Sequence, residues 1–312
     1  MSREYFPAAA LSKPSLLRWS VALFVDYSVV VLAMVAAHSA FGFARQRDFA
    51  AVPDLLAFAV IGFAILVIGT RQHGILVLGH DGSHGLVSRK VWWNDLLTNL
   101  FCFWPFGMGL SGYRKFHFAH HRHMGTESDP ELIHKKSAAP RFDLPATPAR
   151  IVGHAVVALF GAGIADQAFL IKYIVSRDSL APVAMWAVFV LGFWVFDAWW
   201  VPVLWFTALG TSFWASTLMR VWTEHMGTEE THRIYARPIY RLLFLPHNIW
   251  YHFEHHRFPA VPFWNLRRAR ALDIETPVQS LEALLLSYRG YRFIPSGMPV
   301  SPALQLEQLE AA

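Results

Sequence analysis

Long apolar stretches recur along this chain and are separated by short polar segments. The first covers residues 17–43 and the second covers residues 55–78. A helix of roughly 20 apolar residues is long enough to cross the hydrocarbon layer of a membrane, which is about 30 Å thick. Both stretches reach this length, so the pattern predicts two membrane-spanning helices in the N-terminal part of the chain.

The longest apolar stretch lies further along, at residues 182–222, and is nearly uncharged over its 41 residues. At about 1.5 Å per residue in a helix, this is about twice the length of one crossing. We therefore expect two further spans, joined by a hairpin turn near Trp199–Pro202.

Two other apolar stretches are interrupted. Residues 96–110 contain one proline and two glycines, which is typical of a re-entrant or interfacial segment rather than a full span. Residues 151–175 contain a histidine, an aspartate and a lysine. This stretch is compatible both with a span and with a helix that lies on the membrane surface.

The composition agrees with a membrane protein. Of the 312 residues, 54% are apolar and 16% are charged, whereas a soluble domain has about 25% charged residues. Disorder and an ordinary soluble enzyme are therefore disfavoured. The single cysteine, Cys102, excludes an intrachain disulfide and a thiolate metal cluster.

The basic residues lie in the tails and loops, and arginine is frequent after residue 223, in a chain of net charge +5. This distribution favours a positively charged cytoplasmic membrane face over a nucleic-acid partner. We predict an all-α, polytopic membrane helical bundle of about four spans plus re-entrant or interfacial helices. It forms one domain over residues 1–312, with a cytoplasmic N-terminal tail (1–16) and a cytoplasmic C-terminal cap (223–312) that carries a di-metal site.

The di-metal site is predicted from the histidines. Half of the 16 histidines fall into three clusters, which are His80-Asp-Gly-Ser-His84, His117-Phe-Ala-His120-His121 and His252-Phe-Glu-His255-His256. Helix positions i, i+3 and i+4 share one face, and an even number of crossings separates the clusters. All three can therefore meet on one side of the membrane. Eight imidazoles exceed what one ion can bind, so we expect two metal ions.

Other metal sites fit the sequence less well. It contains no HExxH zinc-protease motif. Two Glu-x-x-His pairs occur, Glu131 with His134 and Glu229 with His232. A carboxylate-bridged di-iron bundle needs two further helical glutamates, which we do not find.

At these clusters the chain resembles the membrane fatty acid desaturase superfamily, whose members share three histidine boxes around a di-iron centre. The resemblance is carried by HDGSHG at residues 80–85, HFAHHRHMGTESDPE at 117–131 and WYHFEHHRFPAVPFW at 250–264. The second and third boxes are also similar to those of bacterial carotenoid ketolases and hydroxylases. The resemblance implies a multi-pass protein of the bacterial inner membrane, with both termini and the boxes in the cytoplasm.

The resemblance also implies a ligand set of nine residues. The ninth is expected between the last span and the third box, where His225 is the first candidate and His247 is the alternative. The eight other metal ligands implied are His80, His84, His117, His120, His121, His252, His255 and His256.

Four polar residues near the boxes are candidates for supporting roles. A residue near the position of Asn248 holds a metal-bound water in some members of the superfamily. Asp81, Asp129 and Glu254 are candidate acceptors for imidazole N–H groups, which would fix the orientation of the rings.

The resemblance implies two iron ions and O2 as co-substrate. The expected function is an O2-dependent oxidoreductase that acts on unactivated C–H bonds of a lipid from the bilayer, and foremost a fatty acyl desaturase for acyl-lipids or acyl-thioesters. A carotenoid ketolase or hydroxylase, or a lipid hydroxylase, is the alternative within the superfamily. From another class, a histidine-rich membrane metal transporter is the competing hypothesis.

The electrons must come from outside the chain, because we find neither a flavin motif nor a His-Pro-Gly-Gly haem signature. A ferredoxin or a small haem protein with its reductase is the expected partner. The oligomeric state stays open.

Overall fold

Helices form all the long elements of the chain in the computed structural model, which describes residues 5–46, 52–138, 141–166, 168, 179–228, 230–293 and 299–300. Two short strand pairs complete the described part. Strands β1 (Ile234–Tyr235) and β2 (Gln279–Ser280) are parallel, and β3 (Arg292–Phe293) and β4 (Pro299–Val300) are antiparallel. The predicted all-α class is confirmed in its coarse form.

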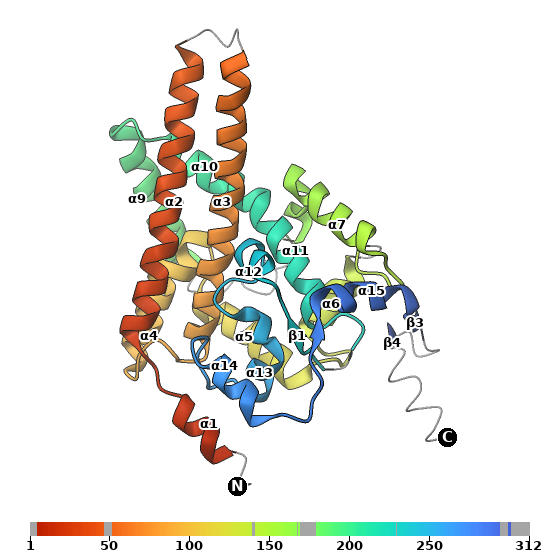
Figure 1. Cartoon of the computed structure of the whole chain (residues 1–312). Coiled ribbons are helices and arrows are strands. Elements are labelled where there is room, and N and C mark those ends of the chain that lie inside the picture. The colour runs from red at the N-terminus through yellow and green to blue at the C-terminus, as the bar shows by residue number, and fades with distance from the viewer. Residues whose placement is uncertain are drawn as a thin grey trace.

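The two longest helices, α2 (Leu16–Arg45) and α3 (Val52–Ser83), lie side by side and extend beyond the rest of the molecule (Figure 1). The side chain of Ser15 caps the start of α2 by accepting a hydrogen bond from the backbone N–H of Arg18. Among the described residues, these are the two helices long and apolar enough to cross a membrane. Their bounds agree with the apolar stretches at 17–43 and 55–78.

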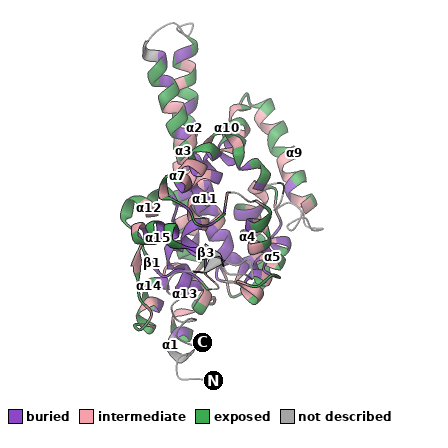
Figure 2. Cartoon of the chain, turned by 90° about the vertical axis from the view of Figure 1, so that its right-hand side faces the viewer, coloured by how far each residue is buried: buried purple, intermediate pink, exposed green. Residues whose placement is uncertain are grey.

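Much of the surface of this helix pair is exposed (Figure 2), and the exposed residues include many large apolar side chains. Phe24 is 73% exposed, Leu32 69% and Phe63 68%. An exposed apolar patch of this size is unfavourable in water and marks contact with another phase or partner. The exposed faces of α2 and α3 therefore suit lipid.

The interrupted stretch at residues 96–110 is broken, as the proline and glycines predicted. Helix α4 (Val91–Thr98) continues into a π turn (Asn99–Phe103) and a 3-10 turn (Trp104–Phe106), and α5 (Leu110–His123) follows. The carbonyl of Pro105 accepts hydrogen bonds from the indole N–H groups of Trp186 and Trp205, at 3.2 and 3.0 Å. The broken segment is thereby fixed against the later apolar helices.

After α6 (Pro130–Ser137), helix α7 (Pro148–Val157) runs into a second π turn (Ala158–Ala162). Part of the predicted 151–175 stretch lies outside the described residues. Residues 182–222 differ from the expected two-helix hairpin, because they belong to three helices: α9 (Leu180–Val195), α10 (Trp200–Gly210) and α11 (Ser212–Glu224). The turn before α10 covers residues 196–199, just ahead of the predicted Trp199–Pro202, whereas the break at Thr211 was not predicted.

A close approach between helices explains where α11 begins. A Cβ atom on Gly69 of α3 would lie 2.1 Å from the Ser212 hydroxyl, and that hydroxyl donates to the Ile65 carbonyl at 2.6 Å. Glycine is therefore required at position 69. The contact fixes the start of α11 against the middle of α3.

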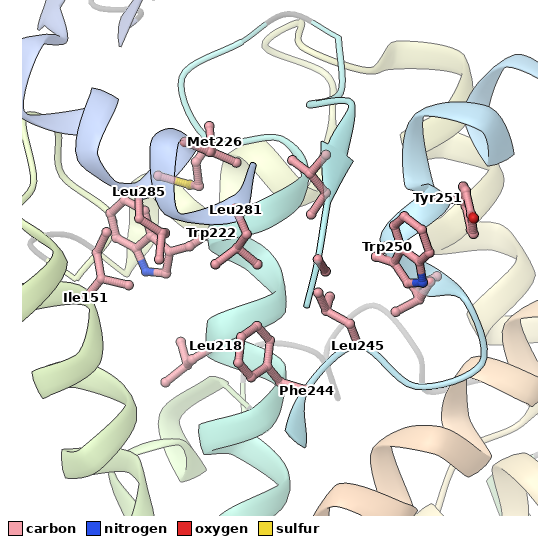
Figure 3. Packing of buried hydrophobic residues seen from close by; sticks show 14 of the residues in the cluster. Ile151, Leu218, Trp222, Met226, Phe244, Leu245, Trp250, Tyr251, Leu281 and Leu285 are labelled. Carbon is pink, nitrogen blue, oxygen red and sulfur yellow. The ribbon is translucent and has the colours of Figure 1, made fainter. Parts of the chain in front are cut away.

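The C-terminal part packs on α11 through a buried apolar cluster (Figure 3). Leu218 and Trp222 of α11 contact the layer formed by Ile151 of α7 and by Leu281 and Leu285 of α15 (Leu281–Ser287). The other short elements of this part are α12 (Pro238–Leu243), a 3-10 turn (Ile249–Tyr251), α13 (His252–Arg257), α14 (Leu266–Ala269) and two further 3-10 turns (Arg270–Leu272 and Tyr288–Gly290).

The N-terminal helix α1 (Tyr5–Leu11) lies at the same end of the molecule as α13 and α14 (Figure 1). The side-chain amide of Asn265 donates to the Leu11 carbonyl at 2.7 Å. The two terminal parts of the chain therefore meet below the same end of the α2–α3 pair.

Candidate metal centre

Nine histidines converge on two points near the C-terminal end of α3. We call the two sets of histidines the five-histidine group and the four-histidine group. Within each group the nearest ring nitrogens all lie within 4.8 Å of one another. The five-histidine group consists of His80, His84, His117, His121 and His255, and the four-histidine group consists of His120, His225, His252 and His256.

Helix geometry distributes the boxes between the groups. On α5, His117 and His121 are four residues apart and point into the five-histidine group, while His120 points into the other. The short helix α13 does the reverse, because its i, i+4 pair joins the four-histidine group and its middle histidine joins the five-histidine group. Each of the two helices therefore serves both groups.

The spacing of the ring nitrogens fits shared metal ions. Two imidazole nitrogens bound at right angles to one ion, each about 2.1 Å from it, lie about 3.0 Å apart, whereas a tetrahedral angle gives about 3.4 Å. The Nε2–Nε2 distances are 2.8 to 3.2 Å for His84–His117, His117–His121, His121–His255, His120–His225, His225–His252 and His252–His256. With all the pairs of each group within 4.8 Å, the rings of a group can share one ion, and iron is among the metals that imidazole suits.

The unpaired ring nitrogens of His80 also indicate a metal ion. Both ring nitrogens of His80 are buried and have no hydrogen-bond partner among the described residues. A buried polar atom without a partner costs about 1–3 kcal/mol. A metal ion in the five-histidine group would satisfy the nitrogen that faces it.

The imidazoles are held in the form that binds metal. Burial lowers the pKa of His117, His255 and His256 well below the usual value, and it lowers the pKa of His121 to about 4. A neutral imidazole has a free lone pair. At His120, burial also lowers the pKa, but the Glu131 charge and the Asp129 hydrogen bond raise it overall.

Two oxygens orient rings of the four-histidine group through Nδ1. Asp129 Oδ1 lies 2.9 Å from His120 Nδ1, and the Glu230 carbonyl lies 3.1 Å from His225 Nδ1. Such contacts fix the tautomer and direct Nε2 toward the ion. Asp129 was expected in this role. Glu224 Oε1 lies 3.3 Å from His252 Nδ1, but that nitrogen has no hydrogen-bond partner among the described residues.

The structure separates the two candidates for the ninth ligand. His225 lies in the four-histidine group, just after α11 ends. His247 instead contacts Asp26 of α2, with 2.5 Å between Nε2 and Oδ2. Asn248 has a left-handed backbone with φ of 60°, and its side-chain amide donates to the Phe263 carbonyl at 3.1 Å.

The other two expected acceptors have different partners. Asp81 Oδ2 accepts from the Phe263 backbone N–H at 2.9 Å, and its Oδ1 lies 3.9 Å from His80 Nδ1. Glu254 accepts from the guanidinium groups of Arg233 and Arg270, both at 2.7 Å. For Glu254, the contacts are therefore with two arginines and not with an imidazole.

A cavity of about 460 Å³ borders both groups. His117 of the five-histidine group and His252 of the four-histidine group line it. Much of the remaining wall is apolar and comes from Leu76, Phe106, Phe206, Leu209, Phe213, Trp214 and Leu218. A cavity of this size and lining is typical of a small-molecule site.

The fold and the site define a helical protein with two long apolar helices and a buried, two-metal histidine centre beside a cavity. Residues 56–283 match the model of the fatty acid desaturase family, and the chain belongs to this family. It is a desaturase-family di-iron oxidoreductase of the histidine-box type.

Curated proteins with similar sequences catalyse different reactions. A dihydrorhizobitoxine desaturase of Bradyrhizobium elkanii is 25% identical, covering 69% of this chain and 68% of the relative. A beta-carotene ketolase of Paracoccus sp. (strain PC1) is 27% identical, covering 72% and 82%. An sn-1 oleoyl-lipid 12-desaturase of Picosynechococcus sp. is 27% identical, covering 65% and 66%.

Proposed function

We propose that the protein is an O2-dependent membrane enzyme that oxidises an unactivated C–H bond of a lipid, with desaturation of a fatty acyl chain as its foremost reaction. One observation carries the proposal: nine imidazoles form two groups, and one imidazole of each group, His117 and His252, lines a mainly apolar cavity. When bound, an iron pair with neutral nitrogen ligands supplies the O2 activation that hydrogen removal from such a bond requires.

The chain's own residues supply binding and orientation. Helices α5 and α13 would hold one ion in each group, because each helix contributes histidines to both. Phe106, Phe213 and Trp214 would pack against an alkyl chain and exclude water from the reacting carbon. His117 and His252 lie on the cavity wall, so the bound chain would pass beside both groups.

We place the histidine groups and both termini on the cytoplasmic side of a bacterial inner membrane. The contact between Asn265 and Leu11 supports a common side for the two terminal parts. The exposed arginines Arg257, Arg267 and Arg268 lie near that end and fit the positive-inside rule. In this arrangement α2 and α3 span the membrane, and α9 with α10–α11 completes about four spans.

A carotenoid ketolase is the second candidate, because a beta-carotene ketolase is 27% identical over 72% of this chain. Membership of an enzyme family argues against the transporter hypothesis. The electron donor in this proposal is a ferredoxin or a small haem protein with its reductase.

Expression in a host of defined lipid and pigment content tests the proposal. Mass spectrometry of the extracts distinguishes a loss of two mass units (desaturation) from a gain of sixteen (hydroxylation) or fourteen (ketone formation). A matched host that expresses His120→Ala is the control. Unchanged lipids, together with fewer than two irons in the purified wild-type protein, would contradict the proposal.

A further inference from the structure

The cavity wall contains a cation that the metal centre does not use. Arg220 of α11 lines the cavity, and its side chain is 16% exposed. Its Nε donates to Glu224 Oε1 at 2.6 Å. The two terminal nitrogens make no hydrogen bond with any residue that the structure describes. Because the side chain lines the cavity, this unused edge of the guanidinium is available to a molecule inside it.

Other well-packed arginines of the same chain provide a comparison. Several use both terminal nitrogens on a carboxylate or a backbone carbonyl, namely Arg71, Arg114, Arg141 and Arg233. Arg241 and Arg270 leave at least one terminal nitrogen without a hydrogen bond to the described residues, but their guanidinium groups lie over the Trp250 ring, at 4.2 and 4.9 Å from its centroid. A guanidinium removed from water is costly unless such partners replace its hydration. For the terminal nitrogens of Arg220, the described residues provide neither kind of partner.

A second donor lies on the same wall. Tyr113 of α5 lines the cavity, and its ring stacks against His117 with 5.5 Å between the centroids. Its hydroxyl has no hydrogen-bond partner among the described residues. Tyr113 also lies within electrostatic reach of Arg220. The same wall includes the carboxylates of Glu131, Asp166 and Glu224, which pair with Lys135, Arg141 and Arg220. The cavity therefore offers a guanidinium fork and a hydroxyl beside an apolar wall and three carboxylates that already have cationic partners.

We propose that Arg220, together with Tyr113, binds a carboxylate group of the substrate inside this cavity. The planar fork of an arginine matches the two oxygens of a carboxylate, and these charge-assisted hydrogen bonds are stronger than neutral ones. The apolar wall contributed by Phe213 and Trp214 suits the attached alkyl chain.

The substrate class follows from this placement. Arg220, His117 and His252 line one cavity of about 460 Å³, so the carbon that is oxidised lies only a short distance from the carboxylate. The substrate is then an amphipathic free acid that enters with its acidic end inside, and not an acyl-lipid or acyl-thioester, whose acyl group carries no carboxylate. The inference rests on the proposed function only in treating this cavity as the substrate site.

A purely structural role predicts something different. Arg220 would then act through Glu224, whose Oε1 lies 3.3 Å from His252 Nδ1, and its loss would disturb metal binding. A carboxylate-binding role leaves the iron content unchanged and alters the affinity for acids. Iron content and binding preference together separate the two roles.

The test measures binding without turnover. Radiolabelled octanoate and 1-octanol are dialysed to equilibrium against the iron-loaded protein in nanodiscs under nitrogen, with empty nanodiscs as the blank. Wild type should bind octanoate at least tenfold more tightly than 1-octanol. Because no O2 is present, this result is independent of whether lipid oxidation is observed.

The variants show which groups carry the preference. Arg220→Gln should keep two irons and lower the octanoate affinity about ten- to hundredfold, with little change for 1-octanol. Arg220→Lys, which keeps the charge without the fork, should fall between Arg220→Gln and wild type. Tyr113→Phe should lose a smaller factor of about threefold.

Three outcomes would overturn the inference. The first is an Arg220→Gln protein that retains the wild-type preference for octanoate. The second is loss of iron in both Arg220→Gln and Glu224→Gln with the preference intact, which would assign Arg220 a positioning role. The third is displacement of octanoate by an equal concentration of inorganic phosphate, which would contradict recognition of a carboxylate.

Discussion

Replacing Arg233 should destabilise the C-terminal part and loosen the third histidine box together. The Arg233 side chain is 3% exposed and its Nε lies 2.7 Å from Glu254 Oε1. Its terminal nitrogens donate to the carbonyls of Arg270, Asp273 and Thr276 at 2.6 to 2.8 Å. Arg233→Met removes all of these contacts while keeping an unbranched side chain of similar length.

The magnitude follows from the groups left behind. Breaking a buried ion pair costs about 3–5 kcal/mol when one partner stays uncompensated. Glu254 keeps Arg270 as a second partner, at 2.7 Å, which moves the expected loss toward about 3 kcal/mol. The matched control is Arg257→Met. The Arg257 side chain is 47% exposed and lies 3.8 Å from Asp273 Oδ2, so its pair contributes about 0–1 kcal/mol.

The assay is thermal unfolding of both variants in the same detergent, followed by circular dichroism, with iron content measured after gel filtration. Arg233→Met should unfold at a clearly lower temperature than wild type and lose iron, because Glu254 lies within α13 between His252 and His255. Arg257→Met should behave like wild type. Equal midpoints for the two variants would refute the argument that this buried network positions the third box.

Three other changes test the centre and its scaffold. His120→Ala or His255→Ala should abolish both turnover and stoichiometric iron, because each removes the single histidine that its helix gives to one group; full activity in either variant would contradict the ligand assignment. Asp129→Asn should weaken iron retention against a chelator about 10- to 100-fold, because Asp129 Oδ1 lies 2.9 Å from His120 Nδ1, compared with exposed Asp143→Asn as control; equal chelation rates would remove Asp129 from this role. Gly69→Val should lower the yield of folded protein, because a Cβ there meets Ser212 at 2.1 Å, whereas Gly62→Ala meets nothing within 4 Å and should be tolerated; the yields of monodisperse protein after gel filtration decide this comparison.

The parts of the site that follow from local geometry could be predicted from the sequence. Spacings of three and four residues place histidines on one helix face, which is why the boxes could be identified before any fold was known. The two N-terminal helices were predictable because length and apolar content alone decide whether a helix can cross a membrane. The preference for His225 over His247 agrees with where the structure places these rings.

What the sequence could not provide depends on contacts between distant segments. The break at Thr211 lies inside an apolar run, and its visible cause is the contact of Ser212 with Ile65 and Gly69 of α3. The partners of Glu254 come from residues 233 and 270, and no local spacing links them to the third box. Arg220 was equally hidden, because an unused guanidinium edge becomes visible only once a cavity is seen beside it.

These long-range contacts explain how a very short helix can position three ligands. Helix α13 has six residues, far fewer than the roughly 12–15 that an isolated helix needs to be even marginally stable in water. Its position must therefore come from outside. Glu254 connects it to Arg233 and Arg270, while Asp81, next to His80, accepts from the Phe263 backbone beyond it. The first and third boxes are thus joined by a hydrogen bond that involves no histidine, so at least one contact between them does not depend on the metal ligands.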